Sequence, residues 1–301
     1  MQTGRPIVSL ITIHFNHLSD TIEFLESALK LTYQPLEIIV VDNGSDKEKI
    51  TADVVKKYSN VRFILLDKNL GFAGGNNVGM KAATGEYFFF LNNDTLLAQG
   101  LLYTIVDFMI AHPDAGMASP KVLYPDGETI QYAGAIGINP MTGRGKRIGL
   151  FEKDHGQYDT DHPTDLGHGA ALIAPRKVAE KIGPMPEAYF LYYEEHDWCM
   201  TARRMGYKMY YVGTASVIHK ESVSTGGDES PQKTYYLSRN RLLFLRRNFK
   251  GVKLFSGLLF FAVLATPKSI FLHLLRGRFD LAKAFIKGIT WNLSNPAKLV
   301  K

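Results

Sequence analysis

Cysteine is almost absent from this chain of 301 residues. Cys199 stands alone, so no disulfide can form within the chain, and this composition suits a reducing compartment. We also expect no secretory signal, because Met1–Pro6 is largely polar and the apolar run Ile7–Ile13 is too short for a signal core with its flanks. That run is typical of a buried strand instead.

Acidic residues are rare in the last part of the chain. From Arg239 to Lys301 there are 13 Lys and Arg residues and a single acid, Asp280, whereas the whole chain carries a formal net charge of +6. Residues 1–238 are therefore net acidic. A uniformly basic protein would indicate nucleic-acid binding, but an acidic body with a basic, apolar tail favours an anionic membrane surface. We expect no nucleic-acid partner.

The sequence also lacks an uninterrupted apolar run of the roughly 20 residues that a membrane-spanning helix needs. The tail contains three shorter apolar segments with basic flanks, Leu254–Ala265, Ser269–Leu275 and Leu281–Trp291. Pro267 and Lys268 would fall in the middle of any longer span. We predict a helical tail over residues 235–301 that lies on the cytoplasmic face of a membrane, peripheral or monotopic. The alternative is that these helices pack on the rest of the protein as an ordinary core.

The first half of the chain alternates apolar runs with segments of helical spacing. The apolar runs are Ile7–Ile13, Ile38–Val41, Val61–Leu66, Tyr87–Leu91 and Gly116–Ser119. The helical segments between them are Thr21–Leu31, Ile50–Tyr58, Asn77–Ala83 and Leu101–His112. Continuous apolar strands separated by helices are typical of parallel strands covered on both faces, so the predicted fold class is α/β.

The second half begins differently and then returns to regular elements. Residues 121–166 are rich in Gly, Pro, Asp and Tyr, which predicts hairpins. After them we predict strands at Ala170–Ala174, Lys208–Val212 and Ser216–His219, and helices at Arg176–Ile182, from Glu194 onwards and at Tyr235–Asn248.

Three predicted strands end in polar clusters. These are His14-Phe15-Asn16, Asp42-Asn43-Gly44-Ser45 and Asn92-Asn93-Asp94-Thr95. Each cluster alone is typical of a turn or a helix cap. In an open α/β sheet, however, ligands bind at the carboxyl ends of the strands. The three clusters together therefore predict a binding site at one sheet edge.

A glycine-rich segment, Gly71 to Asn77, opens a predicted helix. Closely spaced glycines, such as Gly71 and Gly75 beside Asn76, let the backbone approach a ligand, and a helix N-terminus favours anions. The spacing does not match the dinucleotide-binding G-x-G-x-x-G, and a plain structural turn is an equal alternative.

Two further groups suggest chemistry. Asp94 follows a very apolar strand, and one carboxylate with a diphosphate can hold Mg²⁺ or Mn²⁺, to which His219 could add a ligand or be merely structural. Glu194, Glu195 and Asp197 fall in the first turn of a helix. They either stabilise the helix dipole or supply a general base, since crowding by like charges raises proton affinity.

The order of these motifs resembles family 2 glycosyltransferases with the GT-A fold and, within them, a bacterial rhamnosyltransferase-like branch. The resemblance covers about residues 7–247. It is carried by Val8–Asn16, Ile39–Ser45, Asn69–Asn76, Leu91–Thr95, Gly169-Ala170 and Tyr193–Arg203.

The resemblance implies a catalytic domain over residues 1–234, with a mixed and mostly parallel sheet flanked by helices. It implies an inverting transferase that takes rhamnose or a similar sugar from a nucleotide-diphosphate sugar, with Mg²⁺ or Mn²⁺. The acceptor would be a hydroxyl of a glycan or lipid-linked glycan in cell-surface polysaccharide synthesis. The donor would lie among His14, Asn16, Asp42, Asn43, Gly71, Gly75, Asn76, Asn93 and Asp94.

Within that set, the resemblance implies individual roles. Asp42 would contact the nucleotide base, Asp94 would hold the metal and the diphosphate, and Glu195 occupies the position of the catalytic base. Two features depart from the family pattern. The first acid of the Asp-x-Asp motif is Asn92, and the base position holds Glu where the family has Asp, which leaves Glu194 and Asp197 as candidates.

Two other functional classes remain compatible with parts of the sequence. A sugar-nucleotide nucleotidyltransferase shares the α/β architecture and the metal, but it would normally have a basic glycine-rich loop directly after the first strand, where this chain has His14 to His17. A non-catalytic membrane-bound binding module would have no need of the cluster of three acids.

Overall fold

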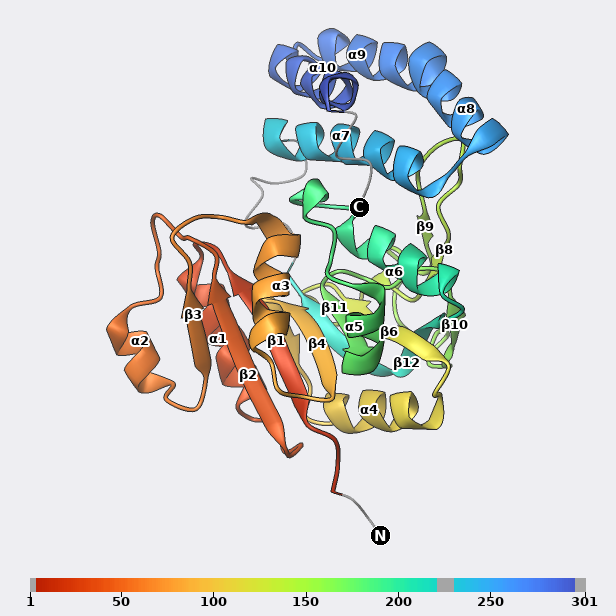
Figure 1. Ribbon diagram of the computed structural model, residues 1–301. Coiled ribbons are helices and arrows are strands. Elements are labelled where there is room, and N and C mark those ends of the chain that lie inside the picture. Colours follow the sequence, from red (N-terminus) through yellow and green to blue (C-terminus); the bar gives the residue numbers. More distant parts are fainter. Residues whose placement is uncertain (1–3, 221–229, 296–301) are drawn as a thin grey trace.

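The computed structural model describes residues 4–220 and 230–295. Figure 1 shows a sheet flanked by helices, beneath a separate layer of C-terminal helices. The strands are β1 (Val8–His14), β2 (Leu36–Asp42), β3 (Arg62–Leu65), β4 (Tyr87–Asn92), β5 (Thr95–Leu97), β6 (Ala115–Leu123), β7 (Ile130–Tyr132), β8 (Ala135–Ile136), β9 (Lys146–Arg147), β10 (His162–Thr164), β11 (Ala171–Pro175) and β12 (Lys208–His219). The α-helices are α1 (Leu18–Ala28), α2 (Ala52–Lys57), α3 (Gly71–Ala82), α4 (Leu101–Ala111), α5 (Arg176–Ile182), α6 (Glu194–Arg204), α7 (Pro231–Asn248), α8 (Gly251–Phe260), α9 (Thr266–Leu275) and α10 (Phe279–Ser294).

The main sheet is mixed, in the order β10-β12-β6-β11-β4-β1-β2-β3. Strands β3, β2, β1 and β4 run parallel, and β11 joins β4 antiparallel. Beyond β11, β6 and β12 again pair in parallel. The predicted α/β class with a mixed, mostly parallel sheet is confirmed. The parallel order also brings the carboxyl ends of β1 and β4 together at one edge.

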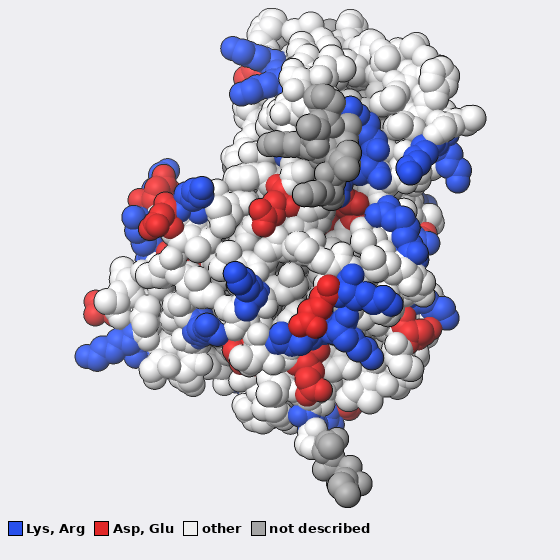
Figure 2. Space-filling view, viewed as in Figure 1, with Lys and Arg blue, Asp and Glu red and all other residues white. Residues whose placement is uncertain are grey.

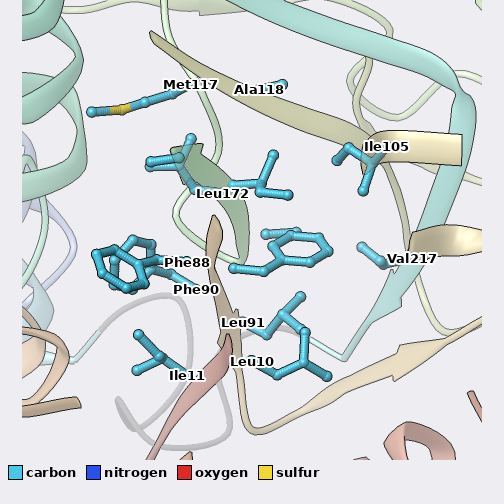
Figure 3. Close-up of a cluster of buried hydrophobic side chains, with 14 of the residues drawn as sticks. Leu10, Ile11, Phe88, Phe90, Leu91, Ile105, Met117, Ala118, Leu172 and Val217 are labelled. Carbon is cyan, nitrogen blue, oxygen red and sulfur yellow. The ribbon is translucent and has the colours of Figure 1, made fainter. Parts of the chain in front are cut away.

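The core lies on both faces of β4. Its sequence Phe88-Phe89-Phe90-Leu91 is buried at every position, because β1 and β11 cover its edges and helices cover its faces. Figure 3 shows Phe88 and Phe90 on one side of the strand, near Ile11 of β1. Fully burying a side chain of this size stabilises the fold by roughly 1.5–3 kcal/mol, so the strand that directly precedes the turn with Asp94 is firmly held.

Some predicted boundaries differ from the structure. The two strands expected at 208–212 and 216–219 form the single strand β12, whose register shifts between Val212 and Ser216 in its pairing with β6. Helix α3 begins at Gly71, six residues before the predicted start at Asn77, because the glycines lie inside its first turns. The expected hairpins between 121 and 166 include the β8–β9 pair.

The C-terminal layer is not a detached tail. Helix α7 starts at Pro231, so the predicted domain boundary at 234 falls inside it, and its Leu243 and Phe244 are fully buried in the main core. Helix α10 packs against α7, where Asn292 Nδ2 of α10 donates to the carbonyl of Arg239 at 2.9 Å. The first tail helix therefore belongs to the same folded unit as the sheet.

The expectation that Pro267 interrupts the apolar tail is wrong. Residues Gly251–Leu275 form one continuous helix of 25 residues, in which the π-helical turn Phe261–Ala265 precedes the proline. Proline has no backbone N–H to donate. In the first turn of a helical segment that follows a π-helical turn, this missing hydrogen bond does not interrupt the helix. In the described ranges this is the one helix long and apolar enough to cross a membrane, judged by length and composition alone.

Most of this long helix faces outward. Only 6% of its apolar window is buried, and Val252, Phe255, Val263 and Leu264 are each more than half exposed. In Figure 2 the helical layer is mainly uncharged, with Lys and Arg gathered at its margins. An apolar face with basic edges is the kind of surface predicted from the sequence to lie on a membrane.

Candidate active site

A cavity of about 470 Å³ opens at the carboxyl ends of β1 and β4. This volume is typical of a site for a small organic ligand. The residues around it come from the whole length of the chain: Ile13, Phe15, Asn43, Asn69, Gly71, Phe72, Asn92, Asn93, Asp94, Arg147, His168, Gly169, Ala170, Phe190, Leu191, Tyr192, Glu194, Glu195, His219, Gln232, Lys233 and Leu237. The cavity thus joins residues of all three predicted clusters to the acids of α6.

The loop before α6 has an unusual backbone. Phe190, Tyr192 and Tyr193 have positive φ angles of 65°, 69° and 78° although none is glycine. Each such residue costs about 1 kcal/mol or more, and strain of this kind persists only where the surroundings enforce it. The strained turn directs Glu194 and Glu195, the first residues of α6, to the cavity wall.

Glu195 lies against the backbone of Gly169. A methyl group at Gly169 would come within 3.2 Å of Glu195 Oε1, so the missing side chain makes room for the carboxylate. The other oxygen, Oε2, is buried and has no hydrogen-bond partner among the described residues. A buried acceptor without a partner is costly, and this one is available to a substrate proton.

Glu194 differs from its neighbour in being almost completely buried. Burial, followed by the charge of Glu195, raises the pKa of Glu194 well above the usual value for a glutamate. Of the two adjacent carboxyl groups, Glu194 therefore holds its proton more tightly than an ordinary glutamate does.

The prediction that Asp197 is one of the candidate catalytic acids is corrected by its position. It does not line the cavity, and its carboxylate accepts hydrogen bonds from Arg247 Nε at 2.5 Å and Asn248 Nδ2 at 2.9 Å. Its position one helical turn past Tyr193 points it towards α7 and away from the ligand space. The structure therefore gives Asp197 the role of joining α6 to α7, and the candidate acids are reduced to Glu194 and Glu195.

Asp94 and His219 come together at the cavity, with 3.2 Å between Asp94 Oδ1 and His219 Nε2. His219 Nδ1 lies 2.7 Å from Gln131 Oε1, which accepts its proton, and Asn92 Nδ2 lies 3.1 Å from Nε2. With Nδ1 protonated, Nε2 accepts a hydrogen bond from Asn92 Nδ2, and the nearby Asp94 Oδ1 receives no hydrogen bond within the described residues.

This pair fits a divalent cation. Two facing electron-rich atoms, a carboxylate oxygen and an imidazole nitrogen oriented from behind, are the donors that Mn²⁺ accepts. Within residues 4–220 and 230–295, however, no group of three or more His, Cys, Asp or Glu is arranged to hold a metal. A cation here needs further ligands from its substrate.

The turn around Asn43 closes the site next to β1. Asn43 Nδ2 donates to the carbonyl of Gly71 at 3.0 Å, and its Oδ1 accepts from the amide of Leu70 at 3.0 Å. Gly71 has a φ of 75°, and a side chain there would collide with the carbonyl of Phe190. Glycine is therefore required where α3 begins against the strained loop.

Several predicted donor contacts lie behind the cavity and not on it. His14 is bonded to Thr21 Oγ1 and the carbonyl of Glu48, and its burial lowers its pKa. Asp42 accepts from the amides of Ser45 and Ile50, both at 2.9 Å. These contacts hold the loop after β2, so the structure corrects the expectation that both side chains face the ligand.

Three more predicted residues support the site without lining it. Asn16 accepts from the amide of Lys47 at 3.0 Å, Gly75 packs on Ile13, and Asn76 donates to the carbonyl of Phe72 at 3.1 Å. Of the donor residues predicted from sequence, the cavity is lined by Asn43, Gly71, Asn93 and Asp94.

Sequence reasoning missed residues that reach the cavity from distant segments. Arg147 comes from β9, His168 precedes β11, and Lys233 lies in α7. Burial lowers the pKa of His168 well below the usual value for histidine, so this side chain is neutral. None of the three lies in a local motif, although the pair His168-Gly169 directly precedes the apolar strand β11 and could have been noticed as a polar segment beside a strand.

A model of a known protein family matches residues 9–182, more than half of the chain, and its description is Glycosyl transferase family 2. The chain belongs to this family. Among its relatives is the low-salt glycan biosynthesis hexosyltransferase Agl10 of Haloferax volcanii, 28% identical over 69% of this chain and 66% of that protein. Another is the N-acetylglucosaminyl-diphospho-decaprenol L-rhamnosyltransferase of Mycobacterium tuberculosis, 25% identical over 74% of this chain and 78% of the relative. The dTDP-rhamnosyl transferase RfbF of Shigella flexneri is 26% identical over 73% of this chain and 74% of its own length.

Solved structures confirm the fold of this family 2 member. GalNAc-T7 with UDP, GalNAc and Mn²⁺ has a TM-score of 0.67 at 15% identity, covering 98% of this chain and 59% of that one. The mannosyltransferase PcManGT of Pyrobaculum calidifontis, in complex with GDP-Man and Mn²⁺, has a TM-score of 0.59 at 18% identity, covering 99% and 86%. The predicted GT-A fold is thereby confirmed.

Some relatives are longer proteins. The chain spans 28% of an uncharacterised relative from Sinorhizobium fredii, which it matches at 28% identity over 82% of its own length.

Proposed function

We propose that this protein is an inverting glycosyltransferase that moves a sugar from a nucleotide-diphosphate sugar to a hydroxyl group. The observation that carries the proposal is the sharing of one cavity by the unpartnered Glu195 Oε2 and the Asp94–His219 pair. A base for the acceptor and a cation site for the leaving group are the two elements that such a transfer needs.

Glu195 is proposed as the general base. Its carboxylate takes the proton of the acceptor hydroxyl while that oxygen forms a bond to the anomeric carbon. The bond between the anomeric carbon and the diphosphate oxygen breaks on the opposite side, and its electron pair leaves with the nucleoside diphosphate. The raised pKa of Glu194 favours its protonated form, which lessens the repulsion between the two neighbouring carboxyl groups.

Asp94 and His219 would hold Mg²⁺ or Mn²⁺, with Gln131 orienting the imidazole from behind. When bound, the cation would neutralise charge on the diphosphate. The mannosyltransferase of Pyrobaculum calidifontis and GalNAc-T7 both carry Mn²⁺ with their nucleotides, which supports the same class of donor and ion here. With one carboxylate and one imidazole, we expect cation binding to depend strongly on the nucleotide.

The sugar proposed is rhamnose or a similar hexose, because two of the relatives are named rhamnosyltransferases and a third is a hexosyltransferase. The acceptor proposed is a glycan or a lipid-linked glycan in cell-surface polysaccharide synthesis. A lipid-linked acceptor is favoured by the position of the apolar helical layer, whose helix α7 both supports the tail and lines the cavity with Gln232, Lys233 and Leu237.

We further propose that the helix Gly251–Leu275 rests on the cytoplasmic leaflet. Its exposed apolar face supplies binding that salt does not screen, and the basic residues around it attract anionic lipid at up to about 1 kcal/mol each. The helix is also fastened along its side, since Gly257 packs on the carbonyl of Pro140 and α9 packs on α10. This attachment favours a helix that lies on the membrane over one that crosses it.

The proposed function is tested by nucleoside diphosphate release. The purified protein is incubated with a panel of UDP-, GDP- and dTDP-sugars, with Mn²⁺ or with a chelator, and with lipid extract as the source of acceptors. Release that requires the cation and increases with acceptor is expected. Pyrophosphate release from a nucleoside triphosphate and a sugar phosphate would instead support a nucleotidyltransferase. Binding without any turnover would support a non-catalytic module.

A further inference from the structure

Two adjacent polar residues are buried in the middle of α7. Arg239 is 6% exposed and Asn240 is 0% exposed. Burying such groups in a helix that packs on an apolar core is unfavourable unless each polar atom finds a partner. The partners of these two side chains lie in one short segment, residues 188–192, which is the strained loop in front of α6.

Asn240 holds three carbonyl groups of this loop. Its Nδ2 lies 3.0 Å from the carbonyl oxygen of Tyr189, 2.6 Å from that of Leu191 and 2.9 Å from that of Tyr192. Its Oδ1 accepts a hydrogen bond from Arg239 Nε at 2.7 Å. One buried amide therefore gathers the backbone of the loop at the points where the positive φ angles turn it.

Arg239 binds the same loop from the neighbouring position on α7. Its Nη2 donates to the carbonyl of Ala188 at 3.0 Å and also to that of Tyr189. The guanidinium is itself fixed over the ring of Trp291 in α10, 4.6 Å from the ring centroid. The loop is thus connected through α7 to the outer helices of the C-terminal layer.

The loop also touches both sides of the cavity. At one end it leads directly into Glu194 and Glu195. At the other, the carbonyl of Phe190 accepts from the amide of Phe72 in α3 at 2.6 Å. A shift of this loop would therefore move Glu195 relative to the ligand space, and misplacement of a reacting group by about 1 Å can cost 100-fold in rate.

We propose that Asn240 is a positioning residue, which holds the strained loop 188–192 so that Glu195 faces the acceptor hydroxyl. This inference rests on the proposed function of Glu195 as the base. It also explains why the C-terminal layer is part of the enzyme: the helix that carries the apolar surface is joined by α7 to the residues that perform the chemistry.

The test compares Asn240→Asp with the wild type and with Ser238→Ala. Aspartate fills the same volume and still accepts from Arg239, but it cannot donate to the three carbonyl oxygens. Ser238 is the neighbour on α7 that bonds Tyr235 and Phe285 and does not touch the loop. Asn240→Ser, which is smaller and retains one donor, serves as a milder second variant.

Two readouts are expected to move together. The kcat of Asn240→Asp should fall by about 10- to 100-fold, whereas its affinity for the donor sugar changes less than about threefold. Chymotrypsin, which cuts after large apolar and aromatic residues, should cleave within residues 189–193 at least tenfold faster than in wild type. Ser238→Ala should leave both unchanged. The proteolysis readout needs no substrate, so it stays informative even if wild-type protein shows no transferase activity, an outcome that would count against the proposed function alone.

Three outcomes would overturn the inference. One is a folded Asn240→Asp or Asn240→Ser variant with wild-type kcat and wild-type resistance of the loop. Another is an equal loss of activity in Ser238→Ala. The third is failure of both Asn240 variants to fold, which would make Asn240 a residue required for folding and not one that positions the base.

Discussion

Glu195→Gln and Asp197→Asn form a pair of substitutions whose effects should separate chemistry from stability. Both replace an acid in the first turn of α6 by its amide. Glu195 has an unpartnered oxygen at the cavity, whereas Asp197 is bonded to Arg247 and Asn248 away from it. The amide in place of Glu195 cannot accept the proton of a hydroxyl group but fills the same space.

The magnitudes follow from these contacts. A general base contributes about 10²–10⁴-fold in rate, so Glu195→Gln should lose that much in kcat. This corresponds to roughly 3–5 kcal/mol of transition-state stabilisation, at about 1.4 kcal/mol for each tenfold change. Asp197→Asn removes the negative charge that faces the Arg247 guanidinium, whose side chain is 12% exposed. Removing one partner of a buried ion pair costs about 3–5 kcal/mol of folding free energy.

The assay measures kcat and the melting temperature of both variants. At about 2–4 °C for each kcal/mol in domains of 150–250 residues, Asp197→Asn should melt roughly 10 °C below wild type. Glu195→Gln should melt within a few degrees of wild type and bind the donor normally. The reasoning is refuted if Asp197→Asn retains its stability and loses activity by a factor of more than about 100, while Glu195→Gln remains active.

Three further predictions follow from the other parts of the site and from the tail. Asp94→Ala and His219→Ala should each raise the Mn²⁺ concentration needed for half-maximal nucleotide binding by at least tenfold, and unchanged Mn²⁺ dependence in both would contradict the assigned cation site. Glu194 has a raised pKa in the folded protein, so its contribution to stability is present at low pH and is lost as pH rises through the folded pKa. Glu194→Gln should therefore have a higher melting temperature than wild type at pH 8, and the difference should shrink towards pH 5. Val263→Asp, on the exposed face of the long helix, should reduce flotation with anionic liposomes at least tenfold. Phe151→Asp, at a residue exposed elsewhere to a similar degree, should not reduce it. Equal flotation of both variants would contradict the proposal that this helix face binds the membrane.

The sheet was predictable from the sequence because its central strands are short, uninterrupted runs of apolar residues. Phe88 to Leu91 is buried on both faces, so every position is apolar and the strand is recognised without knowledge of its neighbours. The position of Asp94 followed in turn, since a polar residue after such a strand lies at the sheet edge. Boundaries were less predictable where a helix begins with glycines, as α3 does, because helical spacing is not expressed in Gly71 to Gly75.

The assignment of roles within the site depended on contacts that have no local sequence signal. Glu195 and Asp197 are two residues apart, and only the arrival of Arg247 from α7 decides which acid is structural. Asp42 and His14 were predicted to face the ligand because they end strands. Instead, both side chains form hydrogen bonds with the backbone of the neighbouring loop. Similarly, nothing near Asn240 in the sequence indicates that it holds a loop 50 residues earlier.

The tail illustrates a different limit. Its charge and apolar content were evident from composition, but Pro267 was expected to divide it. The structure continues the helix through the proline because a π-helical turn lies just before it, an irregularity that sequence patterns do not reveal. The apolar face is consequently longer than expected, at 25 residues.

The configuration of the new glycosidic bond tests the central claim most directly. Proton NMR of the product made by the wild-type protein, from a donor sugar of known anomeric configuration, reports whether the anomeric carbon has been inverted. A single displacement assisted by Glu195 predicts complete inversion, with no product when Glu195→Gln replaces the wild type. A product that retains the donor's configuration would contradict the account, because retention does not arise from one attack on the face opposite the leaving diphosphate.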